Sequence, residues 1–105
     1  MAMAKGKFTV GQLVSHRLFN YRGVIYDVDP VFQGSEEWYR QMAQTRPPKN
    51  RPWYHVLVHN AVHETYVAER NLEPDDSGEP VNHPLTDVHF EEFCDGAYVV
   101  RRRTN

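Results

Sequence analysis

The sequence of 105 residues has a single cysteine, Cys94, and no long run of apolar residues. One cysteine cannot form an internal disulfide, and it excludes a zinc site built from several cysteines. No stretch approaches the roughly 18 consecutive apolar residues that a membrane-spanning helix needs. The first residues, MAMAKGKF, also lack the apolar segment of a secretory signal. These absences predict a single domain over residues 1–105 in a reducing cytoplasm, with no membrane partner.

The sequence also lacks the short motifs of common enzyme classes, such as a glycine-rich phosphate loop or a GxSxG nucleophile elbow. Cys94 lies close to Phe90 and Phe93 in the sequence. A cysteine in such surroundings is more often a small buried hydrophobic side chain than a nucleophile. We therefore expect no catalytic residues, no cofactor and no enzymatic activity.

Charge is unevenly distributed along the chain, although the formal net charge is only −2. Residues 1–60 hold eight lysine and arginine residues against four acidic residues, whereas residues 61–100 hold one arginine against ten acidic residues. The three arginines Arg101, Arg102 and Arg103 then make the C-terminal tail basic. Such polarity favours two differently charged partners, or a homo-oligomer assembled head to tail. The alternative is that the two halves interleave in the fold and their fields cancel.

Short strand patterns separated by turn residues dominate the rest of the chain. Alternating or β-branched residues predict five strands, at residues 12–19, 22–29, 53–59, 64–69 and 97–100. Gly23 inside the second pattern suggests a bulge or a tight corner. Five short strands with few helical residues predict a mainly β fold, a small and strongly bent antiparallel β-barrel of the SH3-like type. Its core is expected to cover about residues 8–100, ahead of a charged tail at residues 101–105.

One or two short helices are expected between these strands. Ser35 can cap a helix that the prolines of residues 45–52 prevent from continuing. Residues 71–80 are rich in turn formers and predict a loop. Residues 85–93 are expected to form one or two helical turns, with Thr86 as the capping residue.

Two carboxylates, Asp27 and Asp29, end the second predicted strand directly before Pro30. Strict alternation places both on one face of the sheet, together with Ile25. Two like charges so close to each other are the arrangement of an acid–base or metal pair. Aspartate before proline is also a common turn signal, so the alternative is that both residues only shape the end of the strand.

Three histidines, His55, His59 and His63, follow one another at a spacing of four. On a helix this spacing would form a metal-binding face. Here the segment is predicted as strand, turn and strand, so His55 and His59 share a strand face, while His59 and His63 could face each other across the hairpin neck. Two imidazoles without a third ligand make a weak metal site. We expect ordinary polar positions and no bound metal.

Basic and aromatic side chains are mixed in the segment RPPKNRPWYH, residues 46–55. Basic groups can neutralise phosphates while aromatic rings stack on bases, so this segment is a candidate nucleic-acid face. The alternative is an exposed loop that Trp53 anchors to the barrel. Selected by charge alone, the candidate DNA-binding residues are Arg17, Arg22, Lys49 and Arg51.

Four blocks of sequence, in this order, are GQLVSHRLFNYRGVIYDVDP, RPWYHVLV, YVAERNL and SGEPVNHP. Together they resemble the heat-shock protein HspQ family, whose domain is called YccV-like or hemimethylated-DNA-binding. The resemblance covers about residues 8–98. The positions that match the family pattern are Gly11, Val14, His16, Arg22, Gly23, Val24, Asp27, Asp29, Pro30, Pro52, Trp53, Tyr54, His55, Tyr66, Glu69 and Leu72.

The resemblance implies a small β-barrel and a cytoplasmic stress protein. It implies two kinds of partner: hemimethylated DNA, and the ATP-dependent protease Lon together with substrates that include the replication initiator. It assigns no catalytic chemistry, so Asp27 and Asp29 are interpreted as structural carboxylates that accept backbone or arginine hydrogen bonds. On this basis we expect a non-enzymatic adaptor for Lon, with the tail Arg101, Arg102 and Arg103 as a candidate protease contact. The alternative is a module that binds hemimethylated DNA.

Overall fold

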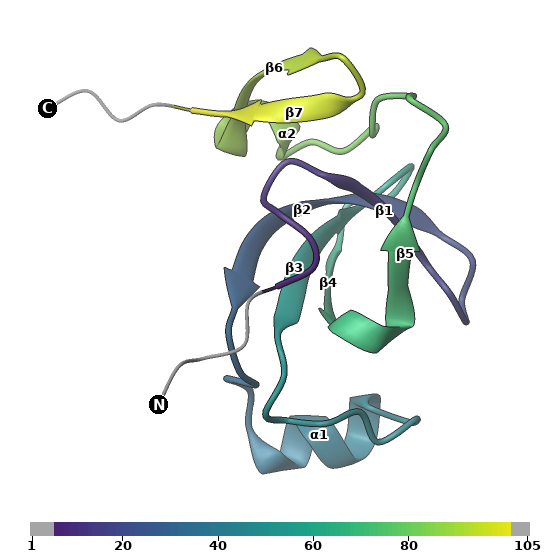
Figure 1. Ribbon diagram of the computed structural model, residues 1–105, viewed down its shortest axis with the longest axis vertical. Helices are drawn as coiled ribbons and strands as arrows, with labels where there is room; N and C mark the ends of the chain where they lie inside the picture. The colour runs from purple at the N-terminus through teal and green to yellow at the C-terminus, as the bar shows by residue number, and fades with distance from the viewer. Residues whose placement is uncertain (1–5, 102–105) are drawn as a thin grey trace, which may run out of the picture.

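The computed structural model describes residues 6–101, which form seven strands, two α-helices and one turn of 3-10 helix (Figure 1). The strands are β1 (Leu13–His16), β2 (Arg22–Asp29), β3 (Trp53–Val58), β4 (Glu64–Ala68), β5 (Leu72–Pro74), β6 (Phe90–Cys94) and β7 (Ala97–Val100). The helices are α1 (Glu36–Met42) and α2 (Thr86–His89), and the 3-10 turn is Glu69–Asn71. No helix in this range is long and apolar enough to cross a membrane.

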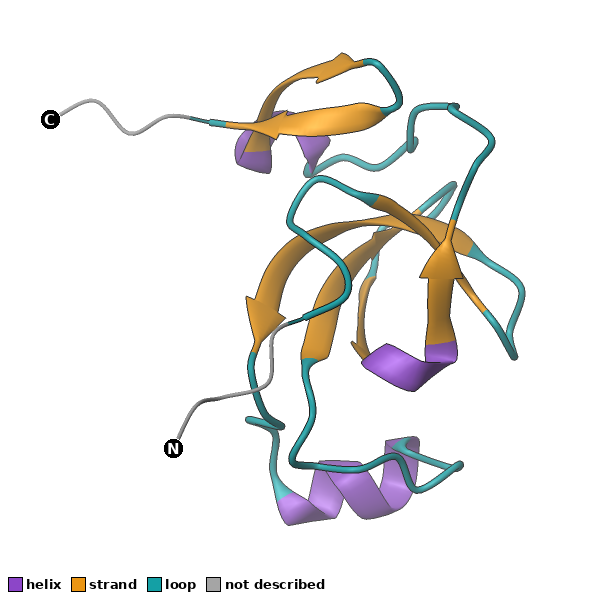
Figure 2. Cartoon of the chain, viewed as in Figure 1, coloured by secondary structure: helices purple, strands orange, loops and turns teal. Residues whose placement is uncertain are grey.

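Five of the strands form one antiparallel sheet in the order β4-β3-β2-β1-β5, and β6 and β7 form a separate hairpin. The two edges of the sheet, β4 and β5, are consecutive in sequence, with only Glu69–Asn71 between them. Because three residues join opposite edges, the sheet must curl until those edges approach each other. It is therefore strongly bent and barrel-like without closing, as Figure 2 shows. The predicted mainly β fold with short helices is confirmed.

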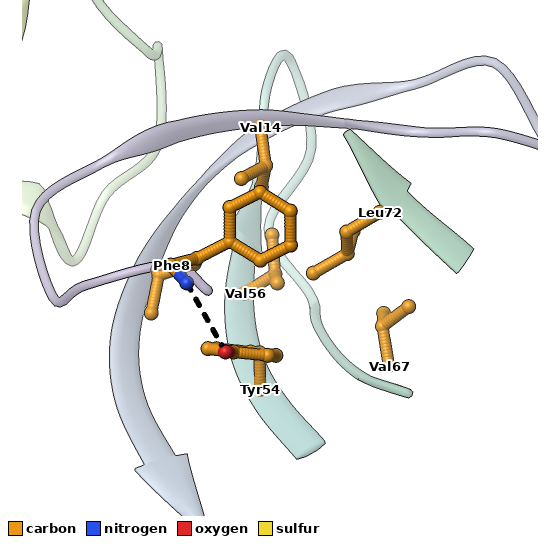
Figure 3. Close-up of a cluster of buried hydrophobic side chains, with 7 residues drawn as sticks. Phe8, Val14, Tyr54, Val56, Val67 and Leu72 are labelled. Atoms are coloured by element: carbon orange, nitrogen blue, oxygen red, sulfur yellow. Dashed lines mark hydrogen bonds between the residues drawn. The ribbon is translucent and has the colours of Figure 1, made fainter. Parts of the chain in front are cut away.

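The inside of the bent sheet is filled by one apolar cluster (Figure 3). Its members are Phe8, Val14, Ile25, Tyr54, Val56, Val67 and Leu72. Burying such side chains is the main favourable contribution to folding. The Tyr54 hydroxyl is satisfied inside the cluster, since it accepts a hydrogen bond from the Phe8 amide at 3.2 Å.

The outer face of the sheet is covered at two opposite ends, by the β6–β7 hairpin with α2 and by α1 (Figure 1). At the hairpin end, Phe90 packs against β-sheet residues Leu13, Val24 and Leu57. At the other end, α1 and the sheet share a cluster of Tyr39, Ala43, Trp53 and Ala68. Burial on both faces explains why β3 is a nearly continuous run of apolar residues.

A bulge in β2 changes which residues face outward. Ile25 pairs with Val56 and Asp27 pairs with His55, which leaves Tyr26 as the extra residue on β2. Ile25 therefore points into the inner cluster. Asp27 and Asp29 share the opposite face, since both are paired at alternate positions with β3. The prediction that both carboxylates lie on one face is confirmed, but the prediction that Ile25 joins them was wrong.

Gly23 does not form this bulge, which lies further along the strand. A Cβ at Gly23 would lie 2.5 Å from both the Leu57 carbonyl oxygen and a methyl group of Val56. The residue is therefore glycine because β2 and β3 approach closely here. At Gly11 the φ angle is +93°, and a Cβ there would collide with the Tyr98 carbonyl.

Helix α1 has the predicted cap and the predicted end. The Ser35 hydroxyl accepts a hydrogen bond from the Trp38 amide at 3.0 Å. The proline-rich segment that follows is held against the helix and the sheet. The Tyr39 hydroxyl donates to the Pro47 carbonyl at 2.6 Å, and the Trp53 indole donates to the Pro48 carbonyl at 3.1 Å.

The predicted loop at residues 71–80 and the predicted helical segment at residues 85–93 were both wrong in part. Leu72–Pro74 form β5, because Leu72 is buried in the inner cluster and pairs with His16. Only Thr86–His89 are helical, and Phe90–Cys94 form β6 against β7. Thr86 is not the cap, since its hydroxyl donates to the His83 carbonyl. The described chain accordingly has seven strands where five were predicted.

Candidate functional site

A groove of about 330 Å³ runs along β4. One wall comes from the turn after β1, which carries Leu18 and Phe19. The other comes from α1 and the segment after it, including Trp38 and Met42. Leu18, Phe19 and Met42 are each more than half exposed. The groove is therefore bordered by apolar side chains that no other part of the described chain covers.

The outer-face wall of this groove is aromatic. The ring of His55 lies 4.5 Å from that of Tyr66 and 5.6 Å from that of Tyr26, measured between centroids. Trp38 extends the surface, with its ring 5.6 Å from Tyr66. These residues come from β2, β3, β4 and α1, so the bent sheet and the helix together assemble the surface.

Carboxylates hold the hydroxyl ends of these tyrosines. Asp29 Oδ2 accepts from the Tyr66 hydroxyl at 2.6 Å and contacts His55 Nε2 at 3.0 Å. Glu64 accepts from the Tyr26 hydroxyl at 2.7 Å. Burial raises the pKa of Tyr66, and the hydrogen bond to Asp29 raises it further. Burial likewise raises the pKa of Tyr26, followed by the bond to Glu64 and the charges of the nearby carboxylates.

Asp29 thus accepts hydrogen bonds from a tyrosine and a histidine, not from backbone amides or an arginine as predicted. Asp27 accepts from the adjacent Val28 amide at 2.9 Å, as the structural interpretation expects. Asp27, Asp29 and His55 are also the residues that could hold a metal ion, since their ligand atoms lie within 4.8 Å of one another. Three ligands fall short of the closed four-ligand shell of structural zinc. The absence of a bound metal stays a prediction.

A family model described as "Hemimethylated DNA-binding protein YccV like" matches residues 6–97 of the chain. The chain belongs to the YccV-like family. This match covers most of the sequence and all of the inner cluster, and it confirms the resemblance noted from the sequence blocks.

Several positions of the YccV-like pattern have clear structural roles here. The Tyr54 hydroxyl donates to Glu69 at 2.7 Å, and the Lys7 amide donates to the same carboxylate oxygen at 2.8 Å. Burial and the bond to Glu69 raise the pKa of Tyr54 to about 12. His16 is buried, and its Nδ1 accepts from the amides of Leu18 and Phe19, both at 3.1 Å. His16 thereby shapes the turn that forms one wall of the groove.

The four arginine and lysine residues selected by charge are not brought together as one basic surface. Arg22 is bonded to Asp75 at 2.8 Å and to the Glu79 carbonyl at 2.5 Å, so it fastens residues 75–79 to β2. Lys49 forms an ion pair with Glu36 and lies 4.3 Å above the centre of the Tyr39 ring. Arg17 and Arg51 are exposed. The Arg22–Asp75 pair joins the basic and acidic halves of the sequence, whereas Lys49 and Glu36 both belong to the first half.

Arg101 is the only tail residue within the described range, because Arg102 and Arg103 lie outside the described residues. Its guanidinium donates to the Asp87 carbonyl at 2.8 Å, and its amide donates to the His89 carbonyl at 3.3 Å. The start of the tail is therefore fastened to α2 rather than to the acidic segment at residues 73–79.

The remaining candidates are dispersed. His59 Nδ1 accepts from the Asn82 amide at 2.8 Å, while His63 is exposed at the far end of the β3–β4 hairpin. Cys94 is exposed, so the prediction that it is buried was wrong. The charges of Asp95 and Glu92 help to raise its thiol pKa, Asp95 most strongly, which disfavours the reactive thiolate.

The sequence interpretation missed the groove itself. Its walls come from the turn at Leu18, from Trp38 and from Tyr66, which are far apart in the chain. The available signal was the pair Leu18–Phe19 within a turn, where exposed large apolar residues are unusual.

Proposed function

We propose that the protein is a non-enzymatic regulatory module that binds segments of other proteins in the β4 groove. In this role it is a cytoplasmic stress protein that promotes degradation of selected proteins, the replication initiator among them, by the ATP-dependent protease Lon. The observation that supports this proposal is the groove, an apolar recess with exposed Leu18, Phe19 and Met42 on its walls. Exposed apolar surface of this kind marks interaction sites on small soluble domains.

An adaptor needs no catalytic residues of its own. If one surface binds a substrate and another binds the protease, the substrate is held near the protease at a high effective concentration. The groove lies along β4, whereas Arg101 leaves the molecule beside α2 at the hairpin end (Figure 1). Arg101 does not line the groove, although its partner His89 stacks on the groove residue Tyr26 at 4.7 Å. The two proposed contacts are therefore distinct but neighbouring surfaces.

Reconstituted degradation tests this function. Purified Lon, ATP and the replication initiator are combined with the wild-type protein or with the variant Phe19→Ser. Phe19 is 62% exposed, so the substitution should leave the fold intact while it removes apolar surface from the groove. We expect faster degradation with the wild-type protein and little acceleration with Phe19→Ser. Val62→Ser is the matched control, since Val62 is 81% exposed and lies in the turn between β3 and β4, outside the groove lining.

The tail contact is tested by deleting residues 101–105. Arg101 donates to two backbone carbonyls of α2, those of Asp87 and His89, so we expect the thermal midpoint to fall by only a few degrees. Surface-binding measurements at physiological salt should show weaker binding to the protease. Unchanged affinity together with a lower midpoint would assign the tail to the fold and leave the groove as the adaptor surface.

A second function, binding of hemimethylated DNA, is supported by the description of the matching family model. Phosphate contacts make DNA affinity fall steeply with salt, with a slope of about 0.9 per contact on duplex DNA. Arg51→Glu should therefore weaken binding and reduce that slope by about one or two units. Lys49→Glu should do the same, although it also breaks the ion pair with Glu36. Equal affinity for unmethylated, hemimethylated and fully methylated duplexes would remove the specificity for hemimethylation.

A further inference from the structure

The edge of β4 that faces away from β3 has unpaired backbone groups. In an antiparallel pair, alternate residues bond to the neighbouring strand and the residues between them point outward. The Val58 amide donates to the His63 carbonyl at 3.4 Å, and the Glu69 amide donates to the Pro52 carbonyl at 3.1 Å. These two bonds fix the pattern, so Thr65 and Val67 bond to β3. The residues that direct backbone groups outward are Glu64, Tyr66 and Ala68.

This edge is the floor of the groove. Tyr66 and Ala68 project from one face of β4, while Thr65 and Val67 project from the other. All four line the same recess. A recess can touch both faces of one strand only where it runs along the edge of that strand. The position that a sixth strand would occupy is therefore open beside Glu64 and Tyr66, whereas Ala68 is buried against Tyr39 and Ala43.

The two walls of the groove differ in chemistry. On the side of Thr65 and Val67 lie the apolar side chains Leu18 and Phe19. On the side of Tyr66 lie the rings of Tyr26 and His55 and the carboxylate of Glu64. Asp29 lies behind this wall, bonded to the Tyr66 hydroxyl, and the ring of His89 stacks on Tyr26 at 4.7 Å. Aromatic faces next to carboxylates attract cations, through the ring quadrupole and through charge.

We propose that the groove binds an extended segment of a partner protein as an added strand beside β4, with a lysine or arginine side chain of that segment against Tyr66 and the Glu64 carboxylate. Side chains of an added strand alternate between the two walls. The preferred segment therefore alternates apolar residues, facing Leu18 and Phe19, with polar residues that include one basic side chain. This inference rests on the proposed protein-binding function and specifies its substrate class.

A labelled peptide tests the assignment. The probe is a nine-residue peptide of alternating threonine and valine with arginine at the central position, blocked at both ends, and its binding is followed by fluorescence anisotropy. The first comparison peptide carries citrulline, which has the shape of arginine without the charge. The second has N-methyl groups on alternate residues and cannot pair along that edge. We expect each change to weaken binding about tenfold, which corresponds to 1.4 kcal/mol.

The N-methylated peptide tests the backbone contact, and a protein variant tests the charge contact. The backbone groups available to the peptide are those of Glu64 and Tyr66, which point away from β3. Glu64→Gln keeps an acceptor for the Tyr26 hydroxyl but removes the charge, so it should weaken the arginine peptide several-fold and leave the citrulline peptide unchanged. Glu73→Gln, an exposed change on β5, is the control.

Hydrogen exchange gives a readout that does not depend on these substitutions. The Tyr66 amide should exchange more slowly when the arginine peptide is bound, whereas the Thr65 and Val67 amides already pair with β3. Unchanged exchange at Tyr66 would overturn strand addition even if the peptide binds. Equal affinity for the arginine and citrulline peptides would overturn the cation assignment.

Competition identifies the occupant. Binding only to protein that lacks residues 101–105 would mean that the basic tail of the chain itself fills the groove, and displacement of the peptide by duplex DNA would assign the groove to nucleic acid. Either result overturns the proposal. Peptide binding as predicted, without any effect on degradation by Lon, would refute the adaptor function but leave this inference standing. Accelerated degradation without peptide binding would support the adaptor function but refute this inference.

Discussion

The two edges of the five-stranded sheet are protected to very different degrees. At β5 the backbone groups of Leu72 and Pro74 point away from β1. The pattern is fixed by two bonds on the β1 side: the Arg17 amide donates to the Asn71 carbonyl, and the Asp75 amide donates to the Leu13 carbonyl. The Leu72 amide is already bonded to the Glu69 carbonyl, and proline has no amide hydrogen. The β5 edge therefore offers a new strand no donor. At β4 the amides of Glu64 and Tyr66 point away from β3 and have no such restriction.

The contrast between the β4 and β5 edges indicates a role for the open β4 edge. Exposed strand edges promote aggregation, and proteins usually shorten them, charge them or place proline in them. The β5 edge has three residues with Pro74 among them, and Arg22 fastens the acidic loop that follows. The β4 edge has five residues and no proline, and the apolar side chains of Leu18 and Phe19 lie on one side of it. Because the β5 edge is protected and the β4 edge is open, we infer a binding role for the β4 edge.

Arg22→Ala should remove the protection of the β5 edge and give the largest loss of stability. The guanidinium donates to Asp75 and to the Glu79 carbonyl, and both contacts are lost together. Burial alone would raise the pKa of Asp75, but bonds from Arg22 and Ser77 outweigh it and lower that pKa. We expect the free energy of unfolding to fall by about 2–3 kcal/mol in urea denaturation.

The matched control for Arg22→Ala is Arg51→Ala, since Arg51 is exposed. Surface substitutions of this kind usually change stability by less than about 0.5 kcal/mol. If the two variants have the same midpoint, Arg22 does not stabilise the β5 edge and the contrast between the edges loses its main support.

Asp29→Ala should destabilise the β4 side by a smaller amount, about 1–2 kcal/mol. The substitution leaves the Tyr66 hydroxyl and His55 Nε2 without their common acceptor. Asp27→Ala is the control, because the Asp27 side chain is exposed and accepts a hydrogen bond from the adjacent Val28 amide. Chemical denaturation gives the loss of free energy of unfolding in each variant. Equal losses in the two variants would mean that the Asp29–Tyr66 contact does not stabilise this edge.

Local sequence patterns predicted the elements that depend on neighbouring residues. The bounds of β2, the Ser35 cap of α1 and the last strand, β7, all follow from alternation or capping within a few positions. β5 and β6 were missed because LEP and FEEFC lack a strand pattern of their own. Each becomes a strand through one buried residue, Leu72 or Phe90, that packs in a tertiary cluster.

The candidate site was less predictable than the fold. Arg22 and Lys49 were selected for their charge, yet each pairs with a carboxylate that the fold brings close, and for Arg22 that partner lies 53 residues away. The bulge at Tyr26 leaves no signal in the sequence, although it decides that Asp29 meets Tyr66 rather than the core. Pairing and register of this kind are properties of the assembled sheet.

High pH should weaken the contact that links the two edges. Tyr54 donates to Glu69 in the turn between β4 and β5, and its pKa is raised to about 12 from 10.0. A raised pKa means that the folded protein favours the neutral hydroxyl. This contribution is therefore fully present below pH 10 and is lost as the pH rises from 10 to 12. In denaturant titrations, the difference in free energy of unfolding between wild type and Tyr54→Phe should become smaller from pH 10 to pH 12. A difference that stays constant would contradict the assignment.

Low pH should produce the smallest effect, confined to one wall of the β4 groove. Burial lowers the pKa of His16 below 6.5. Its Nδ1 accepts the amides of Leu18 and Phe19, and it cannot do so once protonated. A lowered histidine pKa means that this stabilisation is present above pH 6.5 and is lost as the pH falls through the folded pKa. Amide NMR signals of Leu18 and Phe19 should shift together as the pH falls from 7 to 5, with a stability loss of about 1 kcal/mol or less. In His16→Asn the carbonyl of the side chain can still accept an amide but does not titrate, so those shifts should disappear. If they persist in the variant, another group controls the turn, and the Leu18–Phe19 wall is not held by His16.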